Sequence, residues 1–251
     1  MSKSLHLSAE GGIVVIRIDR AKKKNAFTRD MLRELPELVA GQQKPKTKAI
    51  VLTGSDELFS AGVDLSEIGE GASDAGIDDE IAAAGCALRE SRVPVIAAIE
   101  GACMGAAVEL AMSCDLRVVS SKAFFGVPAV RLGILYRPDA IGFLVRELGR
   151  QTAARMLVAG DRISGAESQA AGIAAVVTKP GQALMEALRI GALIETSVPD
   201  AVMATKAVIN AADRGGDLAV FEGLRFELLA SDARRAAVEQ LRASLSDNRK
   251  Q

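Results

Sequence analysis

Aromatic residues, histidine and net charge are all scarce in this sequence of 251 residues. Aromatics make up 3% of the chain and tryptophan is absent, so the core has to be built mainly from Ala, Val, Leu and Ile. A formal net charge of −1 argues against nucleic acid as a partner, because nucleic-acid-binding domains carry an excess of basic residues. The single histidine, His6, excludes a catalytic triad or a metal cluster built on histidine and is expected on a tail or an edge strand. We therefore expect no metal site.

Cysteines and long hydrophobic runs are equally sparse. Cys86, Cys103 and Cys114 are an odd set without a CxxC pair, which favours reduced, buried thiols over a zinc site or a disulfide framework. No apolar run is long enough to span a bilayer, and the N-terminus lacks the apolar core of a signal peptide. These absences predict a soluble, cytoplasmic protein without a membrane partner.

What the chain does have is an alternation of apolar strand patterns and helical patterns over its first 180 residues. Strands are expected over residues 11–19, 48–54, 93–101, 115–121 and 174–178. Helices are expected after Thr28, which could cap the first of them, and over residues 78–89, 106–112, 141–148 and 151–158. Because continuously apolar strands need cover on both faces, this alternation predicts an α/β core.

The pattern changes near residue 180, after which it is helical and amphipathic throughout. We therefore predict an α/β core over residues 1–180 and a helical lobe over residues 181–251. Apolar helix faces in such a lobe could be covered by a neighbouring subunit, so the chain is expected to form a homo-oligomer.

Two stretches rich in small residues share one design. TGSDELFSAGVDL, residues 53–65, runs from a strand end through a small-residue turn to Asp64, and IEGACMGAAVEL, residues 99–110, runs into a helix start near Ala106. Small residues leave backbone N–H groups unobstructed, and two such groups that converge on one oxygen would form an oxyanion hole. Taken singly, either stretch could equally be a tight strand-to-helix turn that needs glycine for steric reasons.

Taken together, these stretches resemble the crotonase superfamily, the enoyl-CoA hydratase/isomerase proteins. The resemblance covers nearly the whole chain and rests on RAKKKNAFT, FSAGVDLSEI, EGACMGAAVELAMSCD, AFFGVPAVRLGI and AARMLVAGDRISGAESQAAGIAAVV. It implies a spiral of repeated ββα units in two nearly perpendicular sheets, followed by a helical lobe that forms a homotrimer or a dimer of trimers. It also implies an enzyme that acts on acyl-CoA thioesters and needs no cofactor, since coenzyme A is part of the substrate.

The resemblance also assigns residues to roles. The backbone N–H groups of Ala61 and Ala106 would form the oxyanion hole that holds the thioester oxygen. The residues expected to contact coenzyme A are Lys24, Ala26, Ala61, Asp64 and Leu65. Glu109, a lone carboxylate in a buried-looking segment, matches the first of two glutamates with which hydratases hold and activate water. A buried structural glutamate is the alternative.

The sequence departs from the family where the second glutamate would stand. Ala129 occupies that position, and alanine can neither orient water nor move a proton. Arg137 stands where some relatives place a catalytic Asp, and its neighbours Tyr136 and Asp139 could supply a substitute acid or simply pack in the loop. Hydration of a 2-enoyl-CoA is the leading hypothesis; isomerisation, acyl-CoA hydrolysis and non-catalytic acyl-CoA binding are the alternatives.

Overall fold

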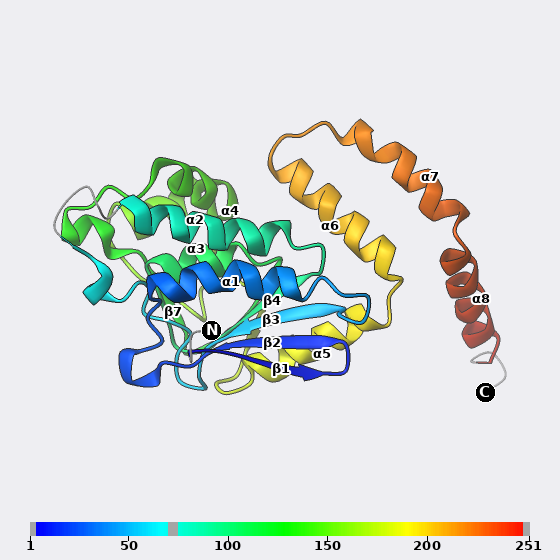
Figure 1. Ribbon diagram of the computed structural model, residues 1–251, viewed down its shortest axis with the longest axis horizontal. Helices are drawn as coiled ribbons and strands as arrows, with labels where there is room; N and C mark the ends of the chain where they lie inside the picture. The colour runs from blue at the N-terminus through cyan, green and yellow to red at the C-terminus, as the bar shows by residue number, and fades with distance from the viewer. Residues whose placement is uncertain (1–3, 70–74, 248–251) are drawn as a thin grey trace. The chain divides into compact units, whose positions relative to one another are not determined.

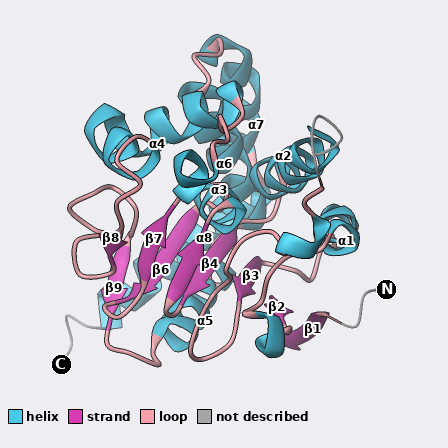
Figure 2. Ribbon diagram, turned by 90° about the vertical axis from the view of Figure 1, so that its left-hand side faces the viewer, coloured by secondary structure: helices cyan, strands magenta, loops and turns pink. Residues whose placement is uncertain are grey.

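A six-stranded sheet is the centre of the fold in the computed structural model, which describes residues 4–69 and 75–247. Its strands, in spatial order, are β1 (Leu5–Glu10), β2 (Ile13–Ile18), β3 (Ala49–Thr53), β4 (Val95–Ile99), β6 (Leu116–Ser120) and β9 (Val176–Thr178). Only the β1–β2 pair is antiparallel, and all the other pairs are parallel (Figure 2). Every residue of β3 and β4 is buried, as strands covered on both faces require. The predicted α/β class is confirmed, and His6 lies on the edge strand β1.

A second, smaller sheet consists of β5 (Ala102–Met104), β7 (Phe124–Gly126) and β8 (Ile163–Ser164). It begins immediately after β4, because Gly101 turns the chain with a φ of 52°. A Cβ at Gly101 would lie 1.9 Å from the Glu57 carbonyl oxygen, so only glycine fits there. Because of this turn, the small-residue stretch of residues 102–106 begins next to the segment around residue 58.

The helices α1 (Arg29–Gly41), α2 (Ala75–Glu90), α3 (Ala106–Met112) and α4 (Pro138–Leu157) lie on one face of the large sheet (Figure 1). Thr28 caps α1 as predicted, since its hydroxyl accepts the Met31 N–H at 3.3 Å. The two helices expected over residues 141–148 and 151–158 both lie within α4, which breaks between them at Gly149, where the backbone is not helical (φ 72°, ψ 157°). Short 3₁₀ turns complete this part of the chain: η1 (Ala21–Lys23), η2 (Leu65–Glu67) and η4 (Pro128–Leu132).

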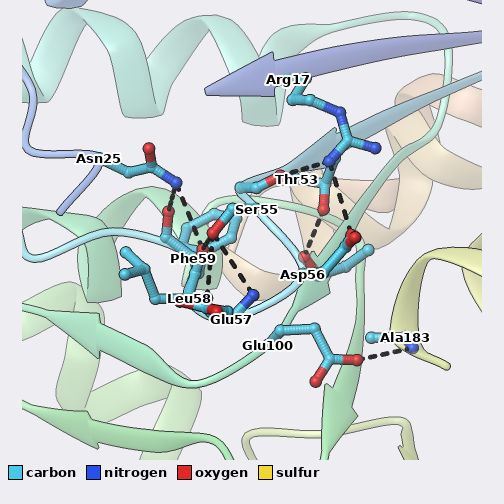
Figure 3. A network of polar contacts seen from close by, with 12 residues as sticks. Arg17, Asn25, Thr53, Ser55, Asp56, Glu57, Leu58, Phe59, Glu100 and Ala183 are labelled. Atoms are coloured by element: carbon cyan, nitrogen blue, oxygen red, sulfur yellow. Dashed lines mark hydrogen bonds and ion pairs between the residues drawn. The ribbon is translucent and has the colours of Figure 1, made fainter. Parts of the chain in front are cut away.

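Helix α5 (Ala183–Glu195) packs on the other face of the sheet (Figures 1 and 2). The Ala183 N–H donates to the Glu100 carboxylate at 3.1 Å, a contact drawn in Figure 3. Gly191 lies against Ile13, where an added Cβ would come within 2.8 Å of Cδ1. Because of these contacts α5 belongs largely to the core, and the two compact units are residues 1–192 and 193–251, whereas the sequence pattern had placed the boundary near residue 180.

The second unit contains α6 (Pro199–Asp213), η5 (Leu218–Phe221), α7 (Glu222–Ala230) and α8 (Asp232–Asp247). These elements line a largely apolar groove of about 710 Å³, with Val208, Leu224, Leu228 and Val238 among its walls. Large apolar side chains of this unit are also exposed to solvent, both outside the groove, at Ile209, Val220 and Phe226, and at its walls, at Leu229 and Leu241. Among the described residues, no helix combines the length and apolar character needed to cross a membrane.

Candidate active site

The side chain of Asn25 links the loop around residues 20–25 to the first small-residue stretch, residues 53–65. Asn25 is fully buried and has a left-handed backbone with a φ of 53°, a conformation that asparagine tolerates better than most residues. Its Nδ2 donates to the carbonyl oxygens of Leu58 at 3.3 Å and Phe59 at 3.2 Å (Figure 3). Its Oδ1 accepts the Arg20 N–H at 2.9 Å. The position of the 58–63 segment is therefore fixed by a residue 33 or more positions earlier.

Backbone hydrogen bonds continue this junction along the segment. The Ala61 N–H donates to the Lys24 carbonyl at 3.0 Å, and the Phe27 N–H donates to the Gly62 carbonyl at 2.7 Å. The Ala61 N–H therefore holds the loop and is not available to a thioester oxygen, which corrects the role that the resemblance implied. The sequence could not reveal this, because the acceptor lies 37 positions away across a non-local contact.

The N–H group that remains open in this loop belongs to Val63. Gly62, with a φ of 97°, turns the chain so closely against the second small-residue stretch that a Cβ on it would lie 3.5 Å from the Ala106 nitrogen. In the described part of the chain, neither the Val63 N–H nor the Ala106 N–H donates to a protein acceptor. Ala106 is the first residue of α3, so its N–H also carries the positive end of the helix dipole. Two open donors thus lie on either side of the Gly62 contact.

Asp64, expected to contact coenzyme A, is instead occupied in holding the turn that follows. Its Oδ1 accepts from the Ser66 N–H at 3.1 Å and from the Ser66 hydroxyl at 2.8 Å, and its Oδ2 pairs with Arg20 at 3.0 Å. The Ser66 hydrogen bonds are the main cause that lowers the pKa of Asp64 to about 2, with Arg20 acting in the same direction. Asp64 is buried, as is Ala26, while Lys24 and Leu65 are exposed at the surface near this turn.

Glu109, on α3, is 3% exposed and has two protein partners. Its Oε1 accepts from Arg137 Nη2 at 2.9 Å, and its Oε2 accepts from the Tyr136 hydroxyl at 3.2 Å. The structure thus brings Tyr136 and Arg137 together at Glu109. The sequence shows these two residues only as neighbours in the loop where some relatives place a catalytic Asp. Asp139 does not share this position: its side chain is 72% exposed and pairs with Arg137 Nε at 2.9 Å.

Arg137 is the residue of this site to which the sequence analysis assigned no role. It precedes Pro138 at the start of α4, and its Nη1 also donates to the Asp78 carbonyl of α2 at 3.1 Å. The sequence signal was its place beside the single tyrosine of the chain, where some relatives have a catalytic Asp. Its guanidinium connects α2, α3 and the start of α4.

The electrostatics of the site favour a carboxylate that can take up and release a proton. Burial raises the pKa of Glu109, and the charge of Arg137 and the Tyr136 hydrogen bond oppose that rise without cancelling it. Burial, helped by the negative charge of Glu109, raises the pKa of Tyr136 well above its usual value. Tyr136 is therefore a phenol at neutral pH and can only donate to Glu109.

The position of the absent second glutamate lies on η4, where Ala129 packs against the hydrophobic core. Ala129 brings no polar atom to the site. Among the residues that the structure describes, no group of three His, Cys, Asp or Glu side chains is arranged as metal ligands. Within residues 4–69 and 75–247, the polar groups that the structure offers here for chemistry are the two open N–H donors and the Glu109–Tyr136–Arg137 cluster.

Comparisons with known proteins point to one family. A family model described as enoyl-CoA hydratase/isomerase matches residues 8–233. The chain is 33% identical to a short-chain-enoyl-CoA hydratase of Clostridium acetobutylicum, over 88% of this chain and 85% of the relative. It is 30% identical to a 2,3-dehydroadipyl-CoA hydratase of Escherichia coli, over 82% of this chain and 81% of the relative. Among solved structures, Pseudomonas aeruginosa DspI superposes with a TM-score of 0.88 at 26% identity, over 96% of this chain and 95% of that one.

Proposed function

The chain belongs to the enoyl-CoA hydratase/isomerase family, and we propose that it adds water to the double bond of a 2-enoyl-CoA thioester. The observation that carries this proposal is the occurrence, on one short helix, of an open N–H donor at Ala106 and a buried carboxylate at Glu109. The donor suits a developing oxyanion, and the carboxylate suits a proton transfer one helical turn away.

The oxyanion hole in this proposal consists of the Val63 and Ala106 N–H groups. Attack of water oxygen on Cβ pushes the double-bond electrons toward the thioester, and the carbonyl oxygen becomes an enolate oxygen. Two N–H donors directed at that oxygen stabilise the enolate more than the ground-state carbonyl, since the charge is larger in the enolate. Loss of one such donor typically lowers the rate about 10²–10³-fold.

Glu109 is the group that takes up and returns a proton during hydration. Its carboxylate takes one proton from the attacking water while the hydroxyl group bonds to Cβ, and a proton is then delivered to Cα as the enolate collapses. With Ala129 in place of a second acid, the same carboxyl group is the nearest source of that proton, so the overall step consumes one water and no net proton. A single carboxyl group that performs both transfers predicts slow hydration compared with a two-glutamate site, because each acid–base role is worth roughly 10²–10⁴-fold.

Double-bond isomerisation is the second candidate, and the single carboxylate favours it. A shift of the double bond in a 3-enoyl-CoA moves one proton from Cα to Cγ through a dienolate, so it needs one base and no water. A panel of 2-enoyl-, 3-enoyl- and 3-hydroxyacyl-CoAs analysed by mass spectrometry separates the possibilities. Hydration adds the mass of one water, isomerisation changes retention at constant mass, and hydrolysis releases free coenzyme A. Saturable binding without turnover would mean a non-catalytic acyl-CoA-binding protein.

Coenzyme A would bind along the exposed side of residues 24–26 and 61–65. Lys24 is exposed and follows the η1 turn with Lys22 and Lys23, which gives three cationic side chains for the phosphates. Leu65 is 72% exposed and offers an apolar surface beside them. Ala26 and Ala61 shape this side through the backbone, and Asp64 does so through the hydrogen bonds of its side chain.

We further propose a homotrimer or a dimer of trimers that forms through the second unit. Its exposed apolar side chains, Phe226 and Val220 foremost, would otherwise face water. Light scattering at micromolar concentration should give a multiple of three chains, and Phe226→Asp should reduce that mass. A wild-type mass of one chain would contradict the proposal.

A further inference from the structure

The guanidinium of Arg137 has three partners, and one of them is the carboxylate of Glu109. Nη2 contacts Glu109 Oε1 at 2.9 Å, Nη1 contacts the Asp78 carbonyl at 3.1 Å, and Nε pairs with Asp139 at 2.9 Å. Its side chain is only 20% exposed. An arginine fixed by three different groups presents a fork of defined direction, unlike a mobile surface cation.

The charges that face Glu109 come from each element packed around it. They are Arg137 and Asp139 at the start of α4 and Arg89 of α2, and the neutral Tyr136 phenol adds a hydrogen bond. Arg89 is itself held by the Ser113 hydroxyl at 2.6 Å and lies over the Phe143 ring at 4.6 Å. A second carboxylate here would make ionisation of Glu109 harder, whereas the nearest charge is a cation that makes it easier.

The two oxygens of Glu109 are consequently not equivalent. Oε1 is bound to a cation at 2.9 Å, while Oε2 has only the longer 3.2 Å bond from the neutral Tyr136 phenol. The Arg137 bond joins two opposite charges and is the shorter one, whereas in the Tyr136 bond only the acceptor is charged, so Oε2 is the oxygen that can exchange its partner more readily.

We infer that Arg137 is a positioning residue for proton transfer, which fixes the ionised Glu109 through Oε1 and leaves Oε2 to exchange the proton with water and substrate. This inference rests on the proposed function of Glu109 as the acid–base group. In other members of the family a second glutamate on η4 would have this orienting role. In this chain the role falls to a cation, Arg137, at the start of α4.

The test compares Arg137→Gln, Arg137→Lys and, as a matched control, Arg155→Gln, which removes an arginine from the exposed Asp161–Glu167 pair. We expect Arg137→Gln to lower kcat about 10²-fold, because a displacement of a reacting group by about 1 Å can cost that much. KM should change little, and the acidic limb of the pH profile should move to higher pH. Arg137→Lys keeps the charge without the fork, so its limb should stay near that of the wild type while kcat remains reduced.

A second readout does not depend on turnover. The infrared difference between the wild type and Glu109→Gln isolates the carboxyl band of Glu109, and its titration should move to higher pH in Arg137→Gln. If no enoyl-CoA is turned over by the wild type, the proposed function fails while this titration still tests the ion pair. If Arg137→Gln does not fold, Arg137→Lys decides alone. Either variant with kcat within twofold of the wild type, or an unmoved titration in Arg137→Gln, overturns the inference.

Discussion

The Tyr136 hydroxyl donates a 3.2 Å hydrogen bond to Glu109 Oε2 across 27 positions of the chain. The contact joins the loop before α4 to the first turn of α3, and it places a permanently protonated group beside the carboxylate that is proposed to accept a proton. A donor in this position stabilises the ionised form of Glu109 and does not compete with it as a base. Several measurable effects depend on this pair.

Replacement of Glu109 by Gln should abolish hydration. The amide keeps the size of the side chain and can still accept from Tyr136, but it cannot take up a proton from water. We expect kcat to fall by roughly 10²–10⁴-fold, the usual contribution of a general acid–base group. Calorimetry with the same acyl-CoA should show unchanged binding in the micromolar range, about −8 kcal/mol. Full activity in this variant would mean that Glu109 is structural and that the acid–base group lies elsewhere.

Tyr136→Phe should move the acidic limb of the kcat/KM profile to higher pH. Glu109 acts as a base only when ionised, so activity is lost as the pH falls through its pKa, which burial already raises above the ordinary value. Removal of the hydroxyl removes one of the groups that hold this pKa down, and the limb therefore moves up. Arg137 has the larger effect on the pKa of Glu109, so the shift should be smaller than in Arg137→Gln.

The shift of the acidic limb should be larger in Arg137→Gln than in Tyr136→Phe. This order distinguishes the loss of specific contacts with Glu109 from a general loosening of the site. A pH profile measured on both variants, with thermal melting to confirm folding, gives that order directly. A limb that moves to lower pH in Tyr136→Phe would contradict the role of the phenol as a donor to the carboxylate.

Asp64→Asn should destabilise the protein in a pH-dependent way. The pKa of Asp64 in the fold is about 2, below its ordinary value of 3.8, so its ionised form stabilises the native state above the ordinary value. That contribution is lost as the pH falls from the ordinary value through about 2. Urea unfolding should show a clear difference between Asp64→Asn and the wild type at pH 7 that shrinks toward pH 2. Asp56→Asn, at a side chain that is 92% exposed, serves as the control and should show no such trend.

The elements that the sequence predicted well are those whose signal is local. Thr28 followed by apolar residues at helical spacing gave α1, and continuous apolar runs gave the parallel strands β3 and β4. A second sheet was expected only from the resemblance, because its strands are two or three residues long, too short for any periodic pattern. Likewise, α5 reads as a lobe helix from its pattern, and only the small residues Ala183 and Gly191 on its buried face show how closely it packs on the core.

Glu109 could be identified from the sequence because a carboxylate among apolar residues is unusual within one segment. Its partners could not, because Tyr136 and Arg137 reach it only through the packing of the start of α4 against α3. The error at Ala61 has the same origin: whether a backbone N–H is open depends on a carbonyl from a distant loop, here that of Lys24. Side-chain identity is visible in a sequence, whereas hydrogen-bond satisfaction is a property of the fold.

The backbone N–H groups of Val63 and Ala106, and not that of Ala61, should stabilise the enolate. Replacement of one residue by its α-hydroxy acid turns its amide into an ester, which removes the N–H and keeps the side chain. At Val63 or Ala106 this change should lower kcat about 10²–10³-fold and should destabilise the protein less than at Ala61, because neither N–H has a protein acceptor and only the preceding carbonyl is weakened. At Ala61 it should leave kcat within a few-fold but lower the free energy of unfolding by about 1 kcal/mol, because the bond to the Lys24 carbonyl is lost. Steady-state rates and urea unfolding of the three esters decide the question. A large loss of kcat at Ala61 together with none at Val63 would restore Ala61 as the donor and would require the loop to rearrange when the thioester binds.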